Sequence, residues 1–330
     1  MQRYTRRSVL VSAAGTVFAS GLGTAPNVPE RASPAGQSCD RRLPRVPYAP
    51  LFCLAYITPD APTQSGQEAM VARYPLAVVP QDDHEVYRSW RDRVRALNPR
   101  ITFLCYQMVH EETTVPGPGH DELRKITHSW CQYPIGFQPY TEYGGQHHRL
   151  YDPRTAEFEH YFLRACAAVL KSYPYEGLFL DNCTVFPIAS PIEAVRTEMR
   201  AALQAILIKL RAEFPDVLLV GNSSYKWNAL NGEMNEARPA QLDEEFAPFP
   251  GHACPHMNMY QAVLRDAKDL GTLRKDMARV LALGAYYGAN VESTHVLWFD
   301  EFDEVLEKYQ KTPHSPTQRP GGAVPGAPPQ

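Results

Sequence analysis

The stretch Tyr173-Pro-Tyr-Glu-Gly-Leu-Phe-Leu-Asp-Asn182 decides the fold. At its centre the unbroken apolar run Leu178-Phe179-Leu180 follows Gly177 and ends at Asp181. A short apolar run bounded by turn residues is typical of a strand buried on both faces of a parallel sheet. A carboxylate that ends such a strand lies at the carboxyl edge of the sheet, where α/β folds place their functional groups. Asp181 is therefore a candidate functional residue, with capping of the next turn or helix as the alternative.

Short apolar runs alternate with amphipathic helical segments along the rest of the chain. The apolar spacing in helical segments is three or four residues, as in residues 84–97 with Trp90 and Val94. Helices are predicted at residues 84–97, 155–172, 191–214, 257–270 and 272–283. Strands are predicted at residues 51–57, 76–79, 101–106, 178–181, 217–220, 241–246 and 284–291.

This alternation predicts a parallel sheet with right-handed crossover connections. Six or seven repeats within roughly 265 residues favour a closed barrel over an open sheet. The sequence therefore predicts an α/β fold, a (β/α)8 TIM barrel in a single domain. Of the eight strands of such a barrel, the seventh, expected between the strands at 241–246 and 284–291, is not visible in the pattern. The long stretch 109–150 shows little periodicity, and a loop of that length inside a compact domain is usually functional.

The two ends of the chain differ from this core. Residues 5–10 read Thr-Arg-Arg-Ser-Val-Leu and precede a weakly apolar run of small residues, the pattern of an export signal. The Arg6-Arg7 pair resembles the twin-arginine signal, and an ordinary Sec signal is the alternative. The apolar run is too short and too rich in glycine for an integral membrane span. We expect an export signal at 1–25, a linker at 26–47, the barrel at 48–311 and a disordered Pro- and Gly-rich tail at 312–330.

Composition narrows the function. Hydrophobic residues make up 44% and charged residues 21% of the chain, the balance of a globular protein. A net charge of −3 argues against nucleic acid as a partner. The chain shows no Gly-x-Ser-x-Gly elbow, Walker loop or Gly-x-Gly-x-x-Gly after a strand, so acyl transfer, phosphate binding and dinucleotide binding lack support.

Metal and disulfide signals are weak. The seven cysteines include no Cys-x-x-Cys pair, and their odd number leaves at least one thiol unpaired within a monomer. Adjacent His147 and His148 diverge on regular elements, and Pro255 interrupts the group of His252, Cys254 and His256. We therefore expect no metal and no cofactor, and sequence cannot assign any disulfide.

Polar residues collect where the predicted strands end, and in a barrel these ends open onto one face. Two carboxylates on that face can act as proton donor and as nucleophile or base, provided that one stays protonated through burial or a neighbouring charge. Carboxylates combined with aromatic side chains fit glycoside hydrolysis better than acyl transfer. For the tyrosines and Trp130 the alternative is core packing, and for Asn222 a turn or cap. The candidate substrate-binding residues are Tyr56, Asp82, Tyr106, Gln107, Trp130, Asn182, Asn222, Trp298 and Glu301.

Several segments resemble the glycoside hydrolases of the TIM-barrel superfamily. They are Trp90 with Leu97-Asn98-Pro99, Tyr151-Asp152-Pro153-Arg154, Tyr175–Asn182, Glu244-Glu245-Phe246, Tyr286-Tyr287 and Trp298-Phe299-Asp300-Glu301. The match covers about residues 48–305 and is most specific at the fourth strand, where Glu176 replaces the usual Asp. The resemblance implies that Asp181 is one catalytic carboxylate and that Glu245, or else Glu244, is the other. It also implies a polysaccharide substrate.

These observations predict an exported, periplasmic or extracellular glycoside hydrolase, monomeric, that cleaves a poly- or oligosaccharide with two carboxylates. The alternative is a non-catalytic carbohydrate-binding barrel in which one carboxylate is missing or misplaced. The separation between the carboxylate of Asp181 and the nearest glutamate carboxylate discriminates the two, since about 5–10 Å suits hydrolysis.

Overall fold

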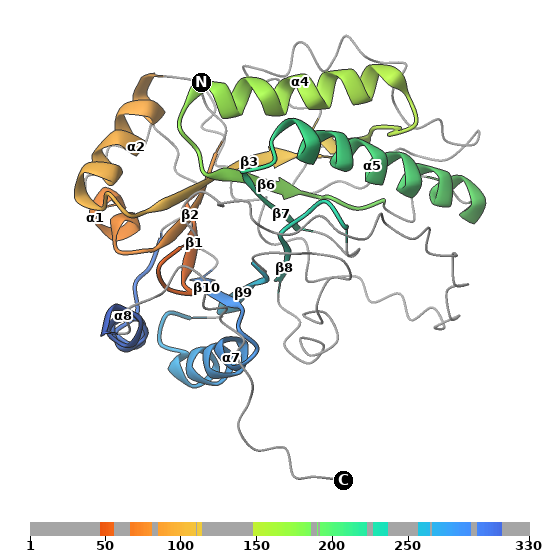
Figure 1. Cartoon of the computed structure of the whole chain (residues 1–330). Coiled ribbons are helices and arrows are strands. Elements are labelled where there is room, and N and C mark those ends of the chain that lie inside the picture. Colours follow the sequence, from red (N-terminus) through yellow and green to blue (C-terminus); the bar gives the residue numbers. More distant parts are fainter. Residues whose placement is uncertain are drawn as a thin grey trace, which may run out of the picture.

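The structure is a computed structural model, which describes residues 47–55, 67–80, 85–109, 111–113, 148–185, 190, 192–222, 227–236, 257–264, 266–291 and 296–311. Eight parallel strands form one sheet in the order β1-β2-β3-β6-β7-β8-β9-β10 (Figure 1). The strands are β1 (Phe52–Leu54), β2 (Leu76–Val79), β3 (Thr102–Met108), β6 (Gly177–Asp181), β7 (Leu218–Asn222), β8 (Gly232–Glu236), β9 (Met259–Leu264) and β10 (Tyr286–Val291).

The sheet closes on itself. Leu51, just before β1, forms a parallel bridge with Tyr287 on β10. The Tyr287 N–H donates to the Pro50 carbonyl at 2.9 Å across the same seam. The predicted (β/α)8 barrel is therefore confirmed.

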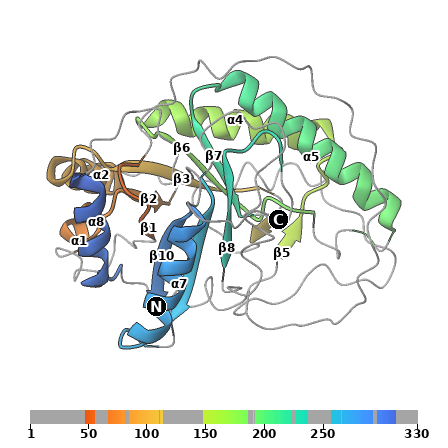
Figure 2. The ribbon, with the colours of Figure 1, turned by 60° about the horizontal axis from the view of Figure 1, so that its bottom comes forward.

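Helices surround the strands on the outside of the barrel (Figures 1 and 2). The α4 and α5 helices lie together over β3, β6 and β7, while α7 packs against β9 and β10. None of the described helices is both long enough and apolar enough to cross a membrane. The helices are α1 (Gln67–Ala72), α2 (Glu85–Leu97), α4 (Ala156–Ser172), α5 (Glu193–Glu213), α7 (Leu270–Ala282) and α8 (Glu301–Lys311).

Side chains on each strand alternate between the barrel interior and the layer under the helices. Phe179 packs inside with residues of other strands, such as Leu104 and Val220. Its neighbours Leu178 and Leu180 pack outside, in the cluster that contains the apolar faces of α4 and α5. Both faces of β6 are thus buried, which explains its continuous apolar run. Because the period of a strand is two residues, Asp181 falls on the interior side, directly beyond Phe179.

The amino end of β6 is fixed by close backbone packing at Gly177 and by hydrogen bonds to Glu176. A Cβ at Gly177 would lie 2.0 Å from the Leu218 carbonyl oxygen, so this approach of β6 to β7 requires glycine. Beside it, Arg95 donates to both carboxylate oxygens of Glu176 at 3.0 Å. The Phe103 N–H donates to Glu176 Oε2 at 2.7 Å, which ties the amino end of β6 to β3 and α2.

Two predicted elements differ from the structure. Residues 257–270 were expected to be helical, but β9 occupies Met259–Leu264 and is the missing seventh strand. Its residues are buried on both faces except Val263, and periodicity alone does not separate such a run from a helix. The sixth barrel strand is β8, whose sequence Gly-Glu-Met-Asn-Glu has one apolar side chain. The segment 241–246, predicted as that strand, lies outside the described residues.

Within the stretch 109–150, two short strands pair antiparallel, β4 (Glu111–Thr113) and β5 (His148–Leu150). β4 follows β3 along the chain, and β5 precedes α4. The four described cysteines, Cys53, Cys105, Cys166 and Cys183, are buried thiols.

Candidate active site

The carboxylate of Asp181 lies at the carboxyl end of β6 and receives three hydrogen bonds. The Tyr106 hydroxyl on β3 donates to Oδ2. The Asn222 Nδ2 on β7 and the backbone N–H of Asn182 both donate to Oδ1 at 2.9 Å. All three donors are neutral, and Asp181 forms no ion pair with any residue that the structure describes.

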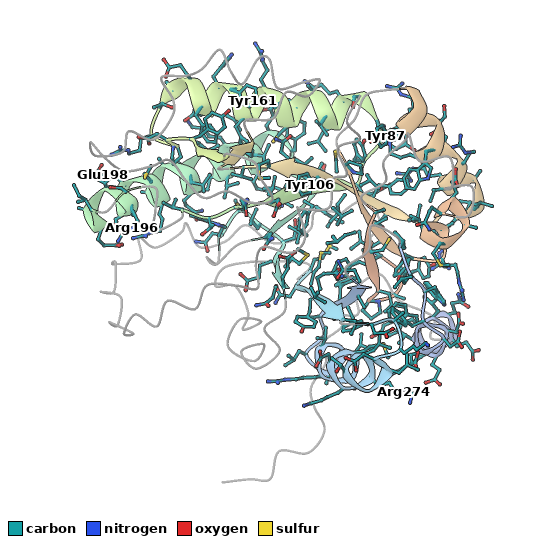
Figure 3. All side chains as sticks on the ribbon, turned by 180° about the vertical axis from the view of Figure 1, so that it is seen from behind. Tyr87, Tyr106, Tyr161, Arg196, Glu198 and Arg274 are labelled. Carbon is teal, nitrogen blue, oxygen red and sulfur yellow. The ribbon has the colours of Figure 1, made fainter. Side chains whose placement is uncertain are left out.

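Strand register brings these groups together. Asp181 pairs with Met108 on β3, and Leu180 pairs with Gly221, which places Asn222 beside Asp181. Tyr106 lies two residues before Met108 and so shares its interior face. Figure 3 shows Tyr106 near the middle of the molecule.

The backbone turns sharply after Asp181. Asn182 has φ 50°, the left-handed region that asparagine tolerates better than most residues. The turn is fixed by backbone hydrogen bonds, from the Val109 N–H to the Asp181 carbonyl at 3.0 Å and from the Cys183 N–H to the Asn222 carbonyl at 2.9 Å. The carboxylate is therefore held by a rigid frame of three strands.

A second carboxyl group, that of Glu236, lies at the carboxyl end of β8. Met234 packs in the barrel interior, so Glu236, two residues on, faces the same side. Burial, followed by the negative charge of Asp181, raises the pKa of Glu236 to about 7. The Asn222 side chain also hydrogen-bonds Glu236, which opposes this rise. Asn222 therefore contacts both carboxyl groups.

The pKa of Asp181 is also raised, chiefly by burial. The hydrogen bonds from Tyr106, Asn222 and the Asn182 backbone act in the opposite direction, because they stabilise the ionised form. The two buried carboxyl groups thus differ in their hydrogen-bond donors. Asp181 has three, whereas the donor to Glu236 among the described residues is Asn222, which also donates to Asp181. Among the described residues, no group of His, Cys, Asp and Glu could hold a metal ion.

The structure brings together three of the predicted substrate-binding residues, Tyr106, Asn182 and Asn222, around Asp181. Gln107 lies beside Tyr106 but belongs to the outer layer, where its buried amide donates to the Met108 carbonyl at 2.9 Å. Tyr56, Asp82, Trp130, Glu244 and Glu245 lie outside the described residues.

Trp298 and Glu301 lie on the outside of the barrel and not with Asp181. The Trp298 ring packs edge-on against Tyr74 at 4.9 Å between centroids, with the Arg73 guanidinium 4.1 Å from its centroid. Glu301 pairs with Arg274 on α7 at 2.9 Å, and Figure 3 shows Arg274 at the edge of the molecule.

Sequence reasoning missed Glu236. Its strand has a polar pattern with one apolar side chain, and no periodicity test recognises such a segment. One signal was present: Glu236 stands two residues after Met234, as Asp181 stands two after Phe179. The same interior alternation that selects Asp181 selects Glu236 once β8 is known.

No family model and no curated protein matches the chain. Among solved structures, the glycoside hydrolase domain of PelA from Pseudomonas aeruginosa matches with a TM-score of 0.54 and 14% identity, over 74% of this chain and 96% of that one. The galactosidase domain of the α-galactosidase–sucrose kinase AgaSK matches with a TM-score of 0.54 and 13% identity, over 80% of this chain and 40% of that one. The α-galactosidase TtGalA from Thermus thermophilus matches with a TM-score of 0.50 and 12% identity, over 82% of this chain and 63% of that one. This likeness shows a shared barrel fold.

Proposed function

We propose that the protein is a glycoside hydrolase that cleaves a poly- or oligosaccharide with Asp181 and Glu236. The observation that carries the proposal is that both carboxyl groups hydrogen-bond Asn222 at the carboxyl end of the barrel. Barrel enzymes place their chemistry at this end. The fold shared with the glycoside hydrolase and α-galactosidase structures supports the same reaction class.

The surroundings of the two groups suit different roles. Three hydrogen bonds favour the ionised form of Asp181, the form required of a nucleophile or base. Glu236, with a pKa of about 7, keeps its proton in weakly acidic solution and can donate it. Asp181 therefore attacks, and Glu236 is the general acid.

We expect retention of anomeric configuration. Asp181 and Glu236 both interact with the Asn222 side chain, so the two carboxyl groups lie close together at the carboxyl end of the barrel. Carboxyl groups of retaining enzymes lie about 5–5.5 Å apart, whereas inverting enzymes need about 6.5–9.5 Å to admit water. This proximity also favours hydrolysis over the non-catalytic carbohydrate-binding alternative.

In the proposed first step, Asp181 bonds to the anomeric carbon while the glycosidic C–O bond breaks and Glu236 protonates the departing oxygen. A covalent glycosyl–enzyme ester results. In the second step the Glu236 carboxylate takes a proton from water, whose oxygen displaces Asp181 from the anomeric carbon. The free sugar leaves, and Glu236 is again protonated.

The test compares wild type, Glu236→Gln and Glu236→Ala on a panel of bacterial exopolysaccharides, plant glycans and aryl glycosides. Loss of the general acid should lower cleavage of natural linkages by about 10²–10⁴-fold. It should lower cleavage of aryl glycosides with acidic phenols far less, since these leave without protonation. Proton NMR of the first product should show the configuration of the substrate.

An inverted first product would contradict the retaining mechanism. Equal losses on glycosides with good and poor leaving groups would remove Glu236 from the acid role. Glu233, on the same strand but facing the outer layer, provides the matched control through Glu233→Gln.

Export belongs to the proposal as well, on the strength of the Arg6-Arg7 motif. Replacing Arg6 and Arg7 with lysine should retain the protein in the cytoplasm of a bacterial host with a twin-arginine pathway. Unchanged export of this variant would point to the Sec route.

A further inference from the structure

We propose that Tyr106 is a positioning residue that decides which of the two carboxyl groups carries the proton, keeping Asp181 ionised and the proton on Glu236. The inference deepens the proposed function and takes from it the roles of the two carboxyl groups. It concerns the regulation of the site by pH.

The hydrogen-bond pattern is asymmetric at Tyr106. Asn222 donates to Asp181 at 2.9 Å and also interacts with Glu236, so its side chain acts on both groups. The Asn182 N–H and the Tyr106 hydroxyl contact Asp181. Asn182 acts through its backbone, which leaves Tyr106 as the described side chain that distinguishes the two carboxyl groups.

Tyr106 also acts on a separate oxygen. Asn222 and the Asn182 N–H both donate to Oδ1 of Asp181, whereas Tyr106 donates to Oδ2. A proton on Asp181 would have to reside on one of these oxygens, and a phenol that donates to Oδ2 competes with it. Hydrogen bonds donated to a carboxylate stabilise its ionised form, most strongly where burial excludes water.

The ring of Tyr106 is held in place for this contact. It stacks on Phe179, with centroids 6.1 Å apart and an interplanar angle of 30°. Phe179 is fully buried two residues before Asp181 on the same strand. The stack therefore links the donor and acceptor strands directly beneath the hydrogen bond.

Among the described residues, three titratable groups face Asp181 from neighbouring elements. They are Tyr106 from β3, Glu236 from β8 and the buried thiol of Cys183, which follows β6. Asn222 on β7 is neutral. Because no described cation pairs with either carboxyl group, the balance between them depends on neutral donors and on their mutual repulsion.

Removal of the phenol should therefore move the two ionisations in opposite directions. Without Tyr106 the proton affinity of Asp181 rises, because its ionised form loses a donor. A less charged Asp181 repels the Glu236 carboxylate less, so Glu236 gives up its proton more readily. A general loosening of the site would not produce opposite shifts.

The experiment is a carbon-13 NMR titration of the carboxyl groups in protein labelled at Asp and Glu, with wild type, Tyr106→Phe and Tyr286→Phe compared. Tyr106→Phe should raise the apparent pKa of Asp181 by about 1 unit, the size expected for one hydrogen bond to a charged group, and lower that of Glu236. Tyr286, another tyrosine in the barrel interior, is the control and should leave both unchanged. On a cleaved substrate, the bell-shaped pH profile of Tyr106→Phe should narrow from both sides.

A second variant should shift the two pKa values in the opposite directions, and it tests the inference even if Tyr106→Phe folds poorly. Incorporation of 3-fluorotyrosine at position 106 makes the phenol a stronger donor, so the two ionisations should move further apart. Shifts in the same direction, or none, in both variants would overturn the inference. Opposite shifts in a protein that cleaves no glycoside would sustain the inference and refute the proposed function.

Discussion

A carboxylate lies at each end of β6, and the two differ in their hydrogen-bond partners. At the amino end, Glu176 meets the Arg95 guanidinium at 3.0 Å and also accepts the Phe103 N–H. At the carboxyl end, the described hydrogen-bond donors to Asp181 are all neutral, and a second acidic group, Glu236, lies nearby. The four residues Gly177–Leu180 thus separate a carboxylate paired with a cation from one that no described cation pairs with.

This difference separates stability from chemistry within a single strand. The Glu176–Arg95 pair satisfies both partners and fixes β6 against β3 and α2. At the other end, burial raises the pKa of both Asp181 and Glu236, and the negative charge of Asp181 raises that of Glu236 further, which costs stability. Such shifts cluster at functional sites because catalysis requires them.

The strongest test of this contrast is the pair Asp181→Asn and Glu176→Gln on hydrolysis. Asp181→Asn removes the attacking carboxylate and should lower kcat by about 10⁴-fold. Glu176→Gln should change kcat by less than about threefold, since it lies at the opposite end of the barrel. Steady-state kinetics on a cleaved glycoside measure both effects. Equal losses of kcat in the two variants would contradict the contrast between the two ends of β6.

In stability the order of the two variants should be reversed, with Glu176→Gln the more damaging change. Glu176→Gln leaves Arg95 without its anion, and side-chain exposures of only 11% for Glu176 and 20% for Arg95 make that loss costly. We expect the free energy of unfolding to fall by about 2 kcal/mol. Asp181→Asn should leave it unchanged or raised, since it removes a buried charge that pairs with no cation among the described residues. Urea denaturation measures both, and Arg95→Met provides the reciprocal control.

Glu236 makes the stability depend on pH. Its folded-state pKa of about 7 lies above its ordinary value of 4.5, so the folded state binds the proton more tightly than the unfolded state. This contribution is fully present below about pH 4.5 and is lost as the pH rises through 7. Relative to wild type, Glu236→Gln should therefore gain roughly 2–3 kcal/mol between pH 4.5 and pH 8. A constant difference across this range in urea titrations would contradict the assigned environment.

The smallest expected effect concerns the turn that ends β6. Alanine adopts the left-handed φ of 50° at position 182 less readily than asparagine does. Asn182→Ala should therefore lower the free energy of unfolding by about 1 kcal/mol. Asn182→Gly accepts this conformation and should be nearly neutral. Differential scanning calorimetry of the two variants separates the backbone requirement from loss of the side chain.

The barrel was predictable because its strands are buried on both faces. Leu178-Phe179-Leu180 shows why: one residue faces the interior cluster and its neighbours face the helices, so the run is apolar throughout. The same property concealed β9, whose apolar residues suit a helix equally well. Conversely, β8 is polar because its interior face ends in Glu236 and its exterior carries the buried Glu233.

Three of the four side chains of the candidate site, all but Glu236, followed from the same logic. Asp181, Tyr106 and Asn222 each end or nearly end a strand that the sequence identified, and parallel register then places them together. Glu236 escaped because its strand was assigned to residues 241–246, several residues too late. The pKa of Glu236 and the sharing of Asn222 depend on distances between strands, which no single stretch of sequence encodes.

The seam between Leu51 and Tyr287 has a consequence for how the chain folds. The partners come from the first and last strands, so closure joins segments separated by nearly the whole barrel. Such non-local contacts form late, because the entropy of closing a long loop must be overcome before the contact stabilises anything. Until β10 arrives, β1 and β9 present open edges that invite association between chains. We therefore expect truncation after α7 to yield an aggregating chain, even though it removes none of Tyr106, Asp181, Asn222 and Glu236.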